Sequence, residues 1–339
     1  AVTRLGFPVD THERLIQSEI LLSETIEQIP YHRLLSKNEG RNDLPRGEYI
    51  SRYAEELHKL CLQIRPSIIH AASFHMNGFA ANMVARNLGI PSIYEIRGLS
   101  DITRQSRHPE WFGTESHQAE VDIEALAAIN ATAVITITDS LKEEMVNRGV
   151  DADKITVIHN GVNTELFKPH SPDNSLSKQL GIRNKVVIGY VGSIVDYEGL
   201  DVLLDAVGIL EQRGIEDFIV LIVGDGACLD SLKTQIEQTK LRTKIIFTGR
   251  VPHDEVVSYY SLIDITPFPR KSLPVTEMVP PMKPFEAMAM EKLVICSDVS
   301  ALTEIVNHEV TGLLFSKDNP ESLADTLLLG INDSELRNR

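Results

Sequence analysis

The chain has 339 residues, of which 42% are hydrophobic and 24% are charged, and its formal net charge is −15. The length indicates two domains, and the composition is typical of a globular protein with a sizeable core. Because nucleic acid needs a basic face, the acidic balance argues against a nucleic-acid partner. The three cysteines, at positions 61, 228 and 296, show neither disulfide-like pairing nor metal-ligand spacing, which favours a reducing compartment.

No segment approaches the roughly 18 apolar residues of a membrane span, and no signal peptide is recognisable. We therefore expect a cytoplasmic protein, and a peripheral contact with the inner face of the membrane stays open. Both ends predict a fragment: residues 1–4 resemble the tail of a strand, and residues 332–339 are polar without an element of their own. A natively processed terminus is the alternative.

Short apolar runs alternate with longer periodic segments in the first half of the chain. Such runs predict strands, and apolar positions at helical spacing predict helices. The predicted strands are 67–71, 92–96 and 133–137, and the predicted helices are 78–88, 121–129 and 139–148. Residues 40–47 predict a loop, and residues 101–118 predict a loop or short helix near a cleft.

A hinge follows, because a short strand at 156–158 precedes a turn at 159–162 and a polar linker at 170–179. A second alternating series then begins. Its predicted strands are 186–192, 218–224, 244–249, 264–267 and 293–296, and its predicted helices are 200–211, 229–240, 254–262, 283–290, 302–307 and 320–330. The sequence therefore divides into a first domain at 1–158, a hinge and linker at 159–180, and a second domain at 181–339.

Strands that alternate with helices predict parallel sheets joined by right-handed crossovers. We therefore expect an α/β protein with two facing, doubly wound Rossmann-like domains. Ligands of such sheets bind beyond the carboxyl ends of the strands. In the second domain these ends carry Gly192, Gly224, Gly249 and the loop 267–283, so we expect the site there.

The glycines at these strand ends are candidate phosphate contacts. Gly192-Ser193 and Gly224 each end a strand before a helix, where backbone can approach a phosphate and a helix N-terminus favours an anion. A simple turn explains such a glycine equally well. Arg250 follows the next strand and is placed to touch a base or phosphate, with an exposed loop arginine as the alternative.

The segment 282–290 carries the strongest site signal. Glu286 lies among Ala, Met and Phe, and a carboxylate in such a helix needs partners; ribose hydroxyls fit, and an ion pair with Lys283 is the alternative. Lys283 lies at the first turn of this helix and has the reach to neutralise a diphosphate. Arg270 precedes it in a loop and is placed to assist.

The order of motifs resembles the retaining GT-B glycosyltransferases of the GT4 (group 1) family. The hinge, with His159-Asn160-Gly161-Val162, resembles the interdomain signature of this family. The second domain resembles its phosphate loop, first helix and nucleotide helix. The matching segments are 157–163, 167–169, 189–192, 199–206, 223–226, 247–251, 285–290, 304–306 and 311–315, and the first half matches more loosely at 90–94 and 131–141.

The resemblance implies transfer of a sugar from a nucleotide-diphosphate donor, by default a UDP sugar, to a saccharide or glycolipid acceptor, with retention at the anomeric carbon. It implies no metal or other cofactor, because basic side chains and backbone amides hold the diphosphate, and it adds Val251 to the nucleotide-binding residues. It also implies that the first domain here is incomplete, since a family member opens with a strand, a glycine-rich loop and a helix. We therefore expect little activity from this chain, with nucleotide binding retained at 180–330.

Three departures from the family pattern concern the catalytic residues. The spacing of the family's glutamate pair, counted back from Glu286, falls on Met278, and Glu277 lies one residue further away. Ser193 and Glu198 stand near the usual places of an arginine and a lysine, so Lys283 becomes the leading diphosphate ligand. Arg97 stands near the place of the family's first-domain histidine. We take Glu277, Arg97 and His75 as catalytic candidates.

Two other functions stay open at this point. One is a GT-B enzyme that does not transfer a sugar, such as a sugar-nucleotide 2-epimerase; the hinge signature argues against it. The other is a catalytically silent protein that binds a nucleotide sugar, which the shifted glutamate favours. The oligomeric state cannot be read from the sequence.

Overall fold

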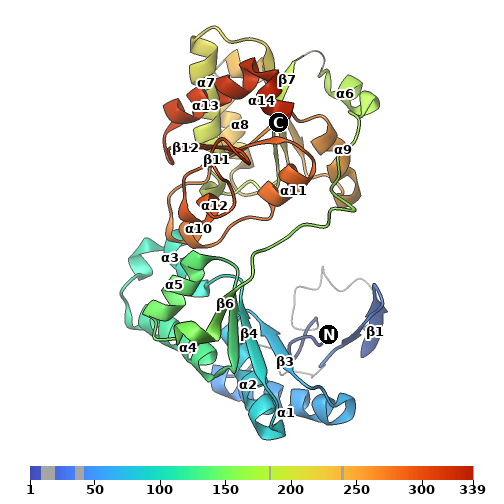
Figure 1. Cartoon of the computed structure of the whole chain (residues 1–339), viewed down its shortest axis with the longest axis vertical. Helices are drawn as coiled ribbons and strands as arrows, with labels where there is room; N and C mark the ends of the chain where they lie inside the picture. The colour runs from blue at the N-terminus through green and yellow to red at the C-terminus, as the bar shows by residue number, and fades with distance from the viewer. Residues whose placement is uncertain (9–19, 35–41, 183–184, 238–239, 339) are drawn as a thin grey trace. The chain divides into compact units, whose positions relative to one another are not determined.

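The computed structural model describes residues 1–8, 20–34, 42–182, 185–237 and 240–338, and it divides into two compact units, Ala1–Ile158 and His159–Arg339 (Figure 1). Each unit is described by itself. None of the helices in these ranges is long and apolar enough to cross a membrane.

The first unit contains a parallel four-stranded sheet in the order β3-β4-β5-β6. A separate antiparallel hairpin, β1–β2, precedes it. The elements of this unit are β1 (Ser23–Ile26), β2 (Ile29–His32), α1 (Arg46–Ile64), β3 (Ile69–Ala72), α2 (His75–Leu88), β4 (Ser92–Ile96), α3 (Ser100–Arg107), the 3-10 helix η2 (Pro109–Trp111), α4 (Glu115–Asn130), β5 (Ala133–Thr136), α5 (Asp139–Asn147), η3 (Ala152–Lys154) and β6 (Ile155–Val157).

Successive strands of this sheet are neighbours, so right-handed crossovers place α2, α4 and α5 on one face. Helix α2 packs against both α1 and α4. The register pairs Ile69 with Ser92 and Ile93 with Ala133, which brings the carboxyl ends of β3 and β4 to the same edge. The N-termini of α2 and α3 begin just beyond that edge.

The second unit is built on six parallel strands in the order β9-β8-β7-β10-β11-β12. Its elements are α6 (Asn174–Leu180), β7 (Val186–Val191), η4 (Asp196–Glu198), α7 (Leu200–Gln212), β8 (Phe218–Val223), α8 (Leu229–Glu237), η5 (Lys240–Thr243), β9 (Ile245–Gly249), η6 (His253–Glu255), α9 (Val256–Ser261), β10 (Ile265–Phe268), α10 (Pro274–Met278), α11 (Lys283–Ala289), β11 (Leu293–Ser297), α12 (Ser300–Thr303), β12 (Leu313–Phe315), α13 (Pro320–Asn332) and α14 (Ser334–Asn338).

The strand order of the second unit reverses direction between β7 and β10. The chain first winds from β7 through β8 to β9, and then crosses back to β10 and continues to β12. Helices consequently cover both faces of the sheet, and the strands are buried on both sides; the side chains of Phe218, Val220, Leu221 and Ile222 have no exposure. A ligand crevice is expected at the carboxyl ends of β7 and β10, where the strand order reverses.

The prediction of an α/β protein with two parallel, Rossmann-like sheets is confirmed, and most predicted strands match within a residue or two. The predicted linker at 170–179 is wrong, because it contains most of α6. Leu176 and Leu180 of this helix pack against the core of the second unit, and Phe167 before it belongs to that core. The segment 159–180 is thus tied to the second unit by apolar contacts.

Other local predictions also need correction. The polar end 332–339 carries the short helix α14, whose Leu336 packs against the core. The helix expected at 302–307 is α12, which begins at Ser300 and ends at Thr303. The loop expected at 40–47 includes the start of α1, and its residues 40–41 lie outside the described ranges. Elements β1, β2, α1, α10 and β12 had no sequence prediction, and α10 lies within the segment 267–283 that was expected as a loop.

A close contact between two glycines shapes the crevice edge. Gly224 has a φ of +142°, and a Cβ at this position would lie 1.8 Å from the carbonyl oxygen of Gly192. We predict that Gly224→Ala lowers the free energy of unfolding by about 2 kcal/mol or more, because both the clash and the backbone conformation disfavour it. Urea unfolding followed by circular dichroism measures this.

The matched control is Gly208→Ala within α7. The atom nearest to a Cβ there is 3.9 Å away, so the substitution should raise stability by about 0.5–1 kcal/mol through helix propensity. Equal stability of Gly224→Ala and the original chain would contradict the prediction.

Candidate functional site

The point where the strand order of the second unit reverses brings a glycine and two cations together. Gly192 follows β7, Arg270 follows β10, and Lys283 begins α11. If a Cβ were added to Gly192, it would lie 2.1 Å from Cε of Lys283. The lysine side chain therefore lies directly across the backbone of this strand end, and both residues are sequence candidates for phosphate binding.

The residues at this edge are glycines, which lets neighbouring groups approach the backbone closely. Gly192 has a φ of +152°, outside the range that other residues readily adopt. Its amide donates to Val223 in β8, and the amide of Gly224 donates to Gly249 in β9. These bonds hold the three strand ends side by side. Exposed Ser193 comes next, and its carbonyl accepts a hydrogen bond from Tyr190.

Lys283 is held by a buried carboxylate. Its Nζ lies 3.0 Å from Oε2 of Glu198, at the end of η4, and 5.2 Å from the centre of the Tyr190 ring. Burial lowers the pKa of Lys283, and the charge of Glu198 opposes that shift. Tyr190 donates a hydrogen bond to the same carboxylate at 3.2 Å, and burial together with Glu198 raises its pKa well above the usual value.

Arg270 is the second cation of this cluster and is only 4% exposed. Its Nη1 donates to the carbonyl of Val279 at 2.7 Å, and its Nε lies 3.7 Å from Oε1 of Glu198, too far for a hydrogen bond. Within the described residues this Nε has no hydrogen-bond partner. A buried unsatisfied donor of a charged group costs about 1–3 kcal/mol or more, which makes Arg270 receptive to an anion.

Glu286 lies one helical turn after Lys283. The ion pair considered as an alternative for it does not form, because Lys283 pairs with Glu198 instead. Glu286 accepts a hydrogen bond of 3.2 Å from the hydroxyl of Tyr260. Burial raises its pKa, and Tyr260, Lys283 and His253 oppose that shift. One carboxylate oxygen is thus fixed by Tyr260, which leaves Glu286 suited to accept from a hydroxyl.

The remaining nucleotide candidates lie further along the same edge. Arg250 and Val251 follow β9, two strands from β7 in the sheet order. Arg250 is exposed, whereas Val251 is half-buried and packs against the core. The structure therefore keeps them at the predicted edge but not beside Lys283.

Glu277 connects three segments of the second unit. Its carboxylate accepts from the backbone and hydroxyl of Ser300 at 2.8 and 2.9 Å, from Ser272 at 2.8 Å and from Lys317 at 2.7 Å. Burial opposes its charge, but the bonds from Lys317, Ser300 and Ser272 lower its pKa to about 2. These contacts tie α10 to α12 and to the segment after β12.

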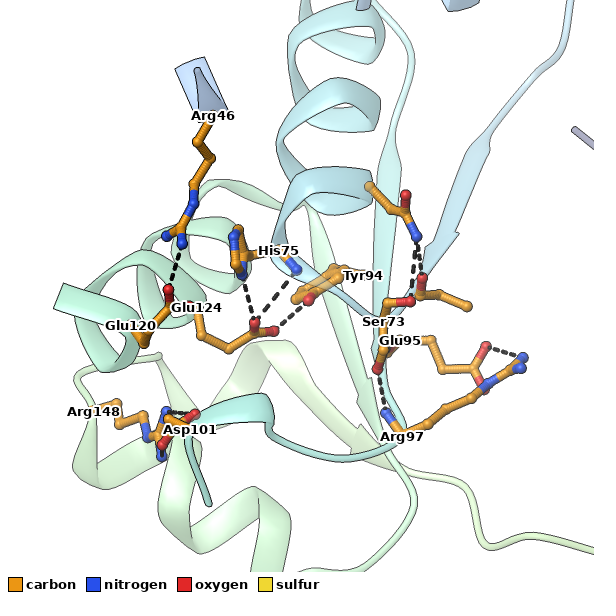
Figure 2. Close-up of polar contacts among 12 residues, drawn as sticks. Arg46, Ser73, His75, Tyr94, Glu95, Arg97, Asp101, Glu120, Glu124 and Arg148 are labelled. Atoms are coloured by element: carbon orange, nitrogen blue, oxygen red, sulfur yellow. Dashed lines mark hydrogen bonds and ion pairs between the residues drawn. The ribbon is translucent and has the colours of Figure 1, made fainter. Parts of the chain in front are cut away.

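Arg97, in the first unit, lies at the carboxyl end of β4 and is 61% exposed at its side chain. Figure 2 shows its guanidinium against Glu95, with distances of 2.7 and 3.1 Å between nitrogen and carboxylate oxygen. Glu95 also lies 2.9 Å from Nε2 of His70. The Arg97 side chain is therefore paired with Glu95 and is still exposed to solvent.

His75 is the first residue of α2 and is only 3% exposed. Its Nδ1 and its backbone nitrogen each lie 3.3 Å from the same oxygen of buried Glu124, and the hydroxyl of Tyr94 donates to the other oxygen (Figure 2). Burial and the charge of Glu124 raise the pKa of Tyr94 well above its usual value. The other ring nitrogen of His75, Nε2, has no hydrogen-bond partner among the described residues.

Sequence reasoning missed the residues that hold these groups. Glu198 drew attention only as a departure from the family pattern, and neither Tyr190 nor Tyr260 carried any signal, because a tyrosine in an apolar run resembles an ordinary core residue. Glu124 is a carboxylate within an apolar helical segment, the same feature that identified Glu286. That signal was present and could have located it.

Comparison with known proteins assigns both units. Residues 172–339 match the family model of glycosyl transferases group 1. Residues 10–166 match that of glycosyltransferase family 4. The two parts of the chain are thus similar to domains of two glycosyltransferase families. The matched segments correspond closely to the two compact units, and Lys283 lies in the segment that matches group 1.

Individual relatives agree with this assignment. An uncharacterized glycosyltransferase of Methanocaldococcus jannaschii is 30% identical over 60% of this chain and 51% of its own length. The alpha-D-kanosaminyltransferase of Streptomyces kanamyceticus is 24% identical over 77% of this chain and 66% of its own length. The chain thus spans about half to two thirds of these relatives.

A solved structure shows the same fold. The crystal structure of Anabaena Alr3699/HepE in complex with UDP superimposes with a TM-score of 0.70 and 20% identity, covering 92% of this chain and 79% of that one. The two units therefore have the GT-B class of fold, as the sequence predicted.

The Lys283 assignment can be tested by calorimetry with UDP and uridine. We predict that Lys283→Ala weakens UDP binding by about tenfold or more, since a charge-assisted contact to phosphate contributes roughly 1.5–3 kcal/mol. Uridine binding should change little. Lys292→Ala is the control, because Lys292 is half-buried at the opposite end of β11. Equal loss for UDP and uridine would refute the assignment.

The contacts of Glu277 predict a pH-dependent stability. A carboxyl with a folded pKa of about 2, against 4.5 ordinarily, stabilises the fold above pH 4.5, and the contribution is lost as the pH falls toward 2. We expect Glu277→Gln to cost about 1–3 kcal/mol at pH 7, since the side chain is partly exposed.

The difference in unfolding free energy between Glu277→Gln and the original chain should shrink in urea titrations at pH 4 and pH 3. Glu237→Gln, on an exposed residue at the end of α8, should show no such trend. A difference that stays constant between pH 7 and pH 3 would rule out the role of these contacts.

Proposed function

We propose that this protein transfers a sugar from a nucleotide-diphosphate donor, by preference a UDP sugar, to a saccharide or glycolipid hydroxyl, with retention of the anomeric configuration. The observation that carries the proposal is the side chain of Lys283 lying across Gly192 at the point where the strand order reverses. A cation beside a glycine at this place of a doubly wound sheet suits a diphosphate.

Binding of the donor would use the two cations in different ways. Lys283 is a point charge that reaches the diphosphate from the start of α11, and Arg270 offers a fixed donor from the end of the neighbouring strand β10. Glu198 faces both in the structure, so it orients the pair before a ligand arrives. Glu286, already held by Tyr260, would accept from a ribose hydroxyl.

The chemical step forms a bond between the acceptor oxygen and the anomeric carbon while the bond from that carbon to the diphosphate breaks. The acceptor proton passes to an oxygen of the departing diphosphate on the same face, which retains the configuration. Lys283 and Arg270 stabilise the negative charge that develops on the leaving group, and this is the principal source of rate acceleration that we propose.

Two further parts of the proposal concern the setting of the reaction. We propose that the diphosphate is held without a metal ion, by Lys283 and Arg270. We also propose a cytoplasmic location, since the cysteines Cys61, Cys228 and Cys296 are free and free thiols are usual in reducing compartments. The UDP bound to the HepE structure supports uridine as the default base.

A donor array tests the function. Glucose carried by UDP, GDP, ADP or dTDP is offered with a panel of saccharide acceptors, and products are followed by proton NMR. We expect consumption of UDP-glucose and a product with the α-anomeric coupling of the donor, in the presence of EDTA. An inverted product contradicts retention, an epimerised donor indicates an epimerase, and binding of UDP without any turnover indicates a silent binding protein.

A further inference from the structure

Two adjoining cavities in the first unit have no role in the donor chemistry. The inner cavity, of about 410 Å³, lies between the starts of α1, α2 and α3, and its lining includes Phe74, His75 and Trp111. The outer cavity, of about 640 Å³, lies along α3 and is lined among others by Arg97, Arg104 and Arg107. The two share Phe74, Ser100 and Arg104, so they adjoin at these residues.

The inner cavity has two buried polar groups that lack a partner. His75 is 3% exposed and Trp111 8% exposed. In the described residues neither Nε2 of His75 nor Nε1 of Trp111 has a hydrogen-bond partner. Buried polar groups are nearly always paired, so two orphans in one cavity wall point to a ligand with hydroxyl or ether oxygens.

The environment of His75 prepares it for that ligand. Figure 2 shows its Nδ1 turned to the carboxylate of Glu124, while the rest of the ring lies on the side of Arg46 and Glu120, which also line the inner cavity. The contact with Glu124 occupies Nδ1, so Nε2 is the ring nitrogen that remains for a ligand. A sugar hydroxyl is a matching partner.

Most charges of the inner cavity are paired. Arg46 is paired with Glu120, and Asp101 with Arg148 at 2.7 and 3.2 Å, which leaves Arg104, shared with the outer cavity, as the remaining charge. The aromatic rings of Phe74 and Trp111 add flat apolar surface. A wall with paired charges, aromatic rings and orphan hydrogen-bonding groups is suited to a sugar ring, and the volume lies within the roughly 300–1,000 Å³ of ligand pockets.

The outer cavity has a different character. Arg104 and Arg107 lie one turn apart on α3 and line the same wall. Arg104 also stacks over Trp111, with Cζ 4.3 Å from the ring centre, and so joins the two cavities. Among the described residues that line the outer cavity there is no carboxylate, although Glu95 neutralises Arg97 from outside the lining. On a chain of net charge −15, such a wall is suited to an anion.

We propose that these adjoining cavities together bind a phosphorylated saccharide, with the sugar ring against His75 and Trp111 and the phosphate on Arg104 and Arg107. This inference rests on the proposed function, of which it specifies the acceptor: a sugar linked to a phosphate group rather than a neutral glycan. The phosphate belongs either to a free sugar phosphate or to a lipid-linked sugar, and both present the same chemistry to the two arginines.

Trp111 is the only tryptophan of the chain, so its indole N–H gives a single NMR signal from the inner cavity. The 15N-labelled full chain is first saturated with UDP, which occupies the donor crevice, and is then titrated with glucose 1-phosphate, glucose or inorganic phosphate. We expect glucose 1-phosphate to shift the Trp111 signal with an affinity about tenfold above that of either component.

Variants separate the two cavities. The single variant Arg107→Gln and the double variant Arg104→Gln/Arg107→Gln should each reduce the affinity for glucose 1-phosphate to that for glucose. The control variant Arg86→Gln, on the exposed surface of α2, should not change this affinity. Arg104 stacks on Trp111, so its loss could by itself shift the Trp111 signal. The single variant Arg107→Gln leaves this stacking contact in place and therefore reports on phosphate binding alone. Equal affinities for glucose and glucose 1-phosphate, or for phosphate and glucose 1-phosphate, would overturn the proposal, as would no shift at millimolar ligand.

Vesicles distinguish the two sources of the phosphate. Phosphatidylcholine vesicles that carry a prenyl-diphosphate-linked glucose should bind more tightly than glucose 1-phosphate if the acceptor is lipid-linked, and less tightly if it is free. Equal binding to sugar-free phosphatidic acid vesicles would overturn the saccharide assignment. The affinity for UDP, measured on the same sample, reports on the donor crevice alone, so failure of the proposed function is recognised separately.

Discussion

Three charged side chains meet in the interior of the second unit, where β7 and β10 end side by side: Lys283, Glu198 and Arg270. Charges out of water are tolerated only with partners at close range, so the positions of η4, of the loop after β10 and of α11 depend on one another. The ion pair between Lys283 and Glu198 at 3.0 Å also explains why Gly192 carries no side chain, since the lysine fills that space. The crevice is a consequence of this packing.

The first unit also contains a buried carboxylate that is stabilised by close partners. Glu124 is buried in α4, and Tyr94 from β4 and His75 from α2 surround its carboxylate. The cluster fixes the N-terminus of α2 against the sheet. It leaves Nε2 of His75 without a hydrogen-bond partner among the described residues. Each unit thus holds a buried carboxylate that contacts a candidate site residue at the edge where strands end, a recurrent way to preorganise a site.

The regular elements were largely predictable, because periodicity reports burial directly. Strands such as β7 and β8 are buried on both faces and appear as continuous apolar runs, and α7 repeats its apolar positions at helical spacing. Two of the failures share one cause. Helices α6 and α14 are short and mostly polar, and single contacts of Leu176, Leu180 and Leu336 with the core stabilise them. Such tertiary contacts leave almost no periodic signal.

For the site, the sequence by itself determined which residues lie at strand ends: glycines after β7 and β8, a lysine and a glutamate at the start of α11, and a histidine after β3. It could do so because the carboxyl ends of parallel strands share one edge. Only the tertiary structure decided the partners, placing Lys283 on Glu198, Glu286 on Tyr260, Glu277 on Ser300 and Lys317, and His75 on Glu124. Partner choice depends on strand order and on helix packing, which bring together groups far apart in the chain, and local patterns do not encode those distances.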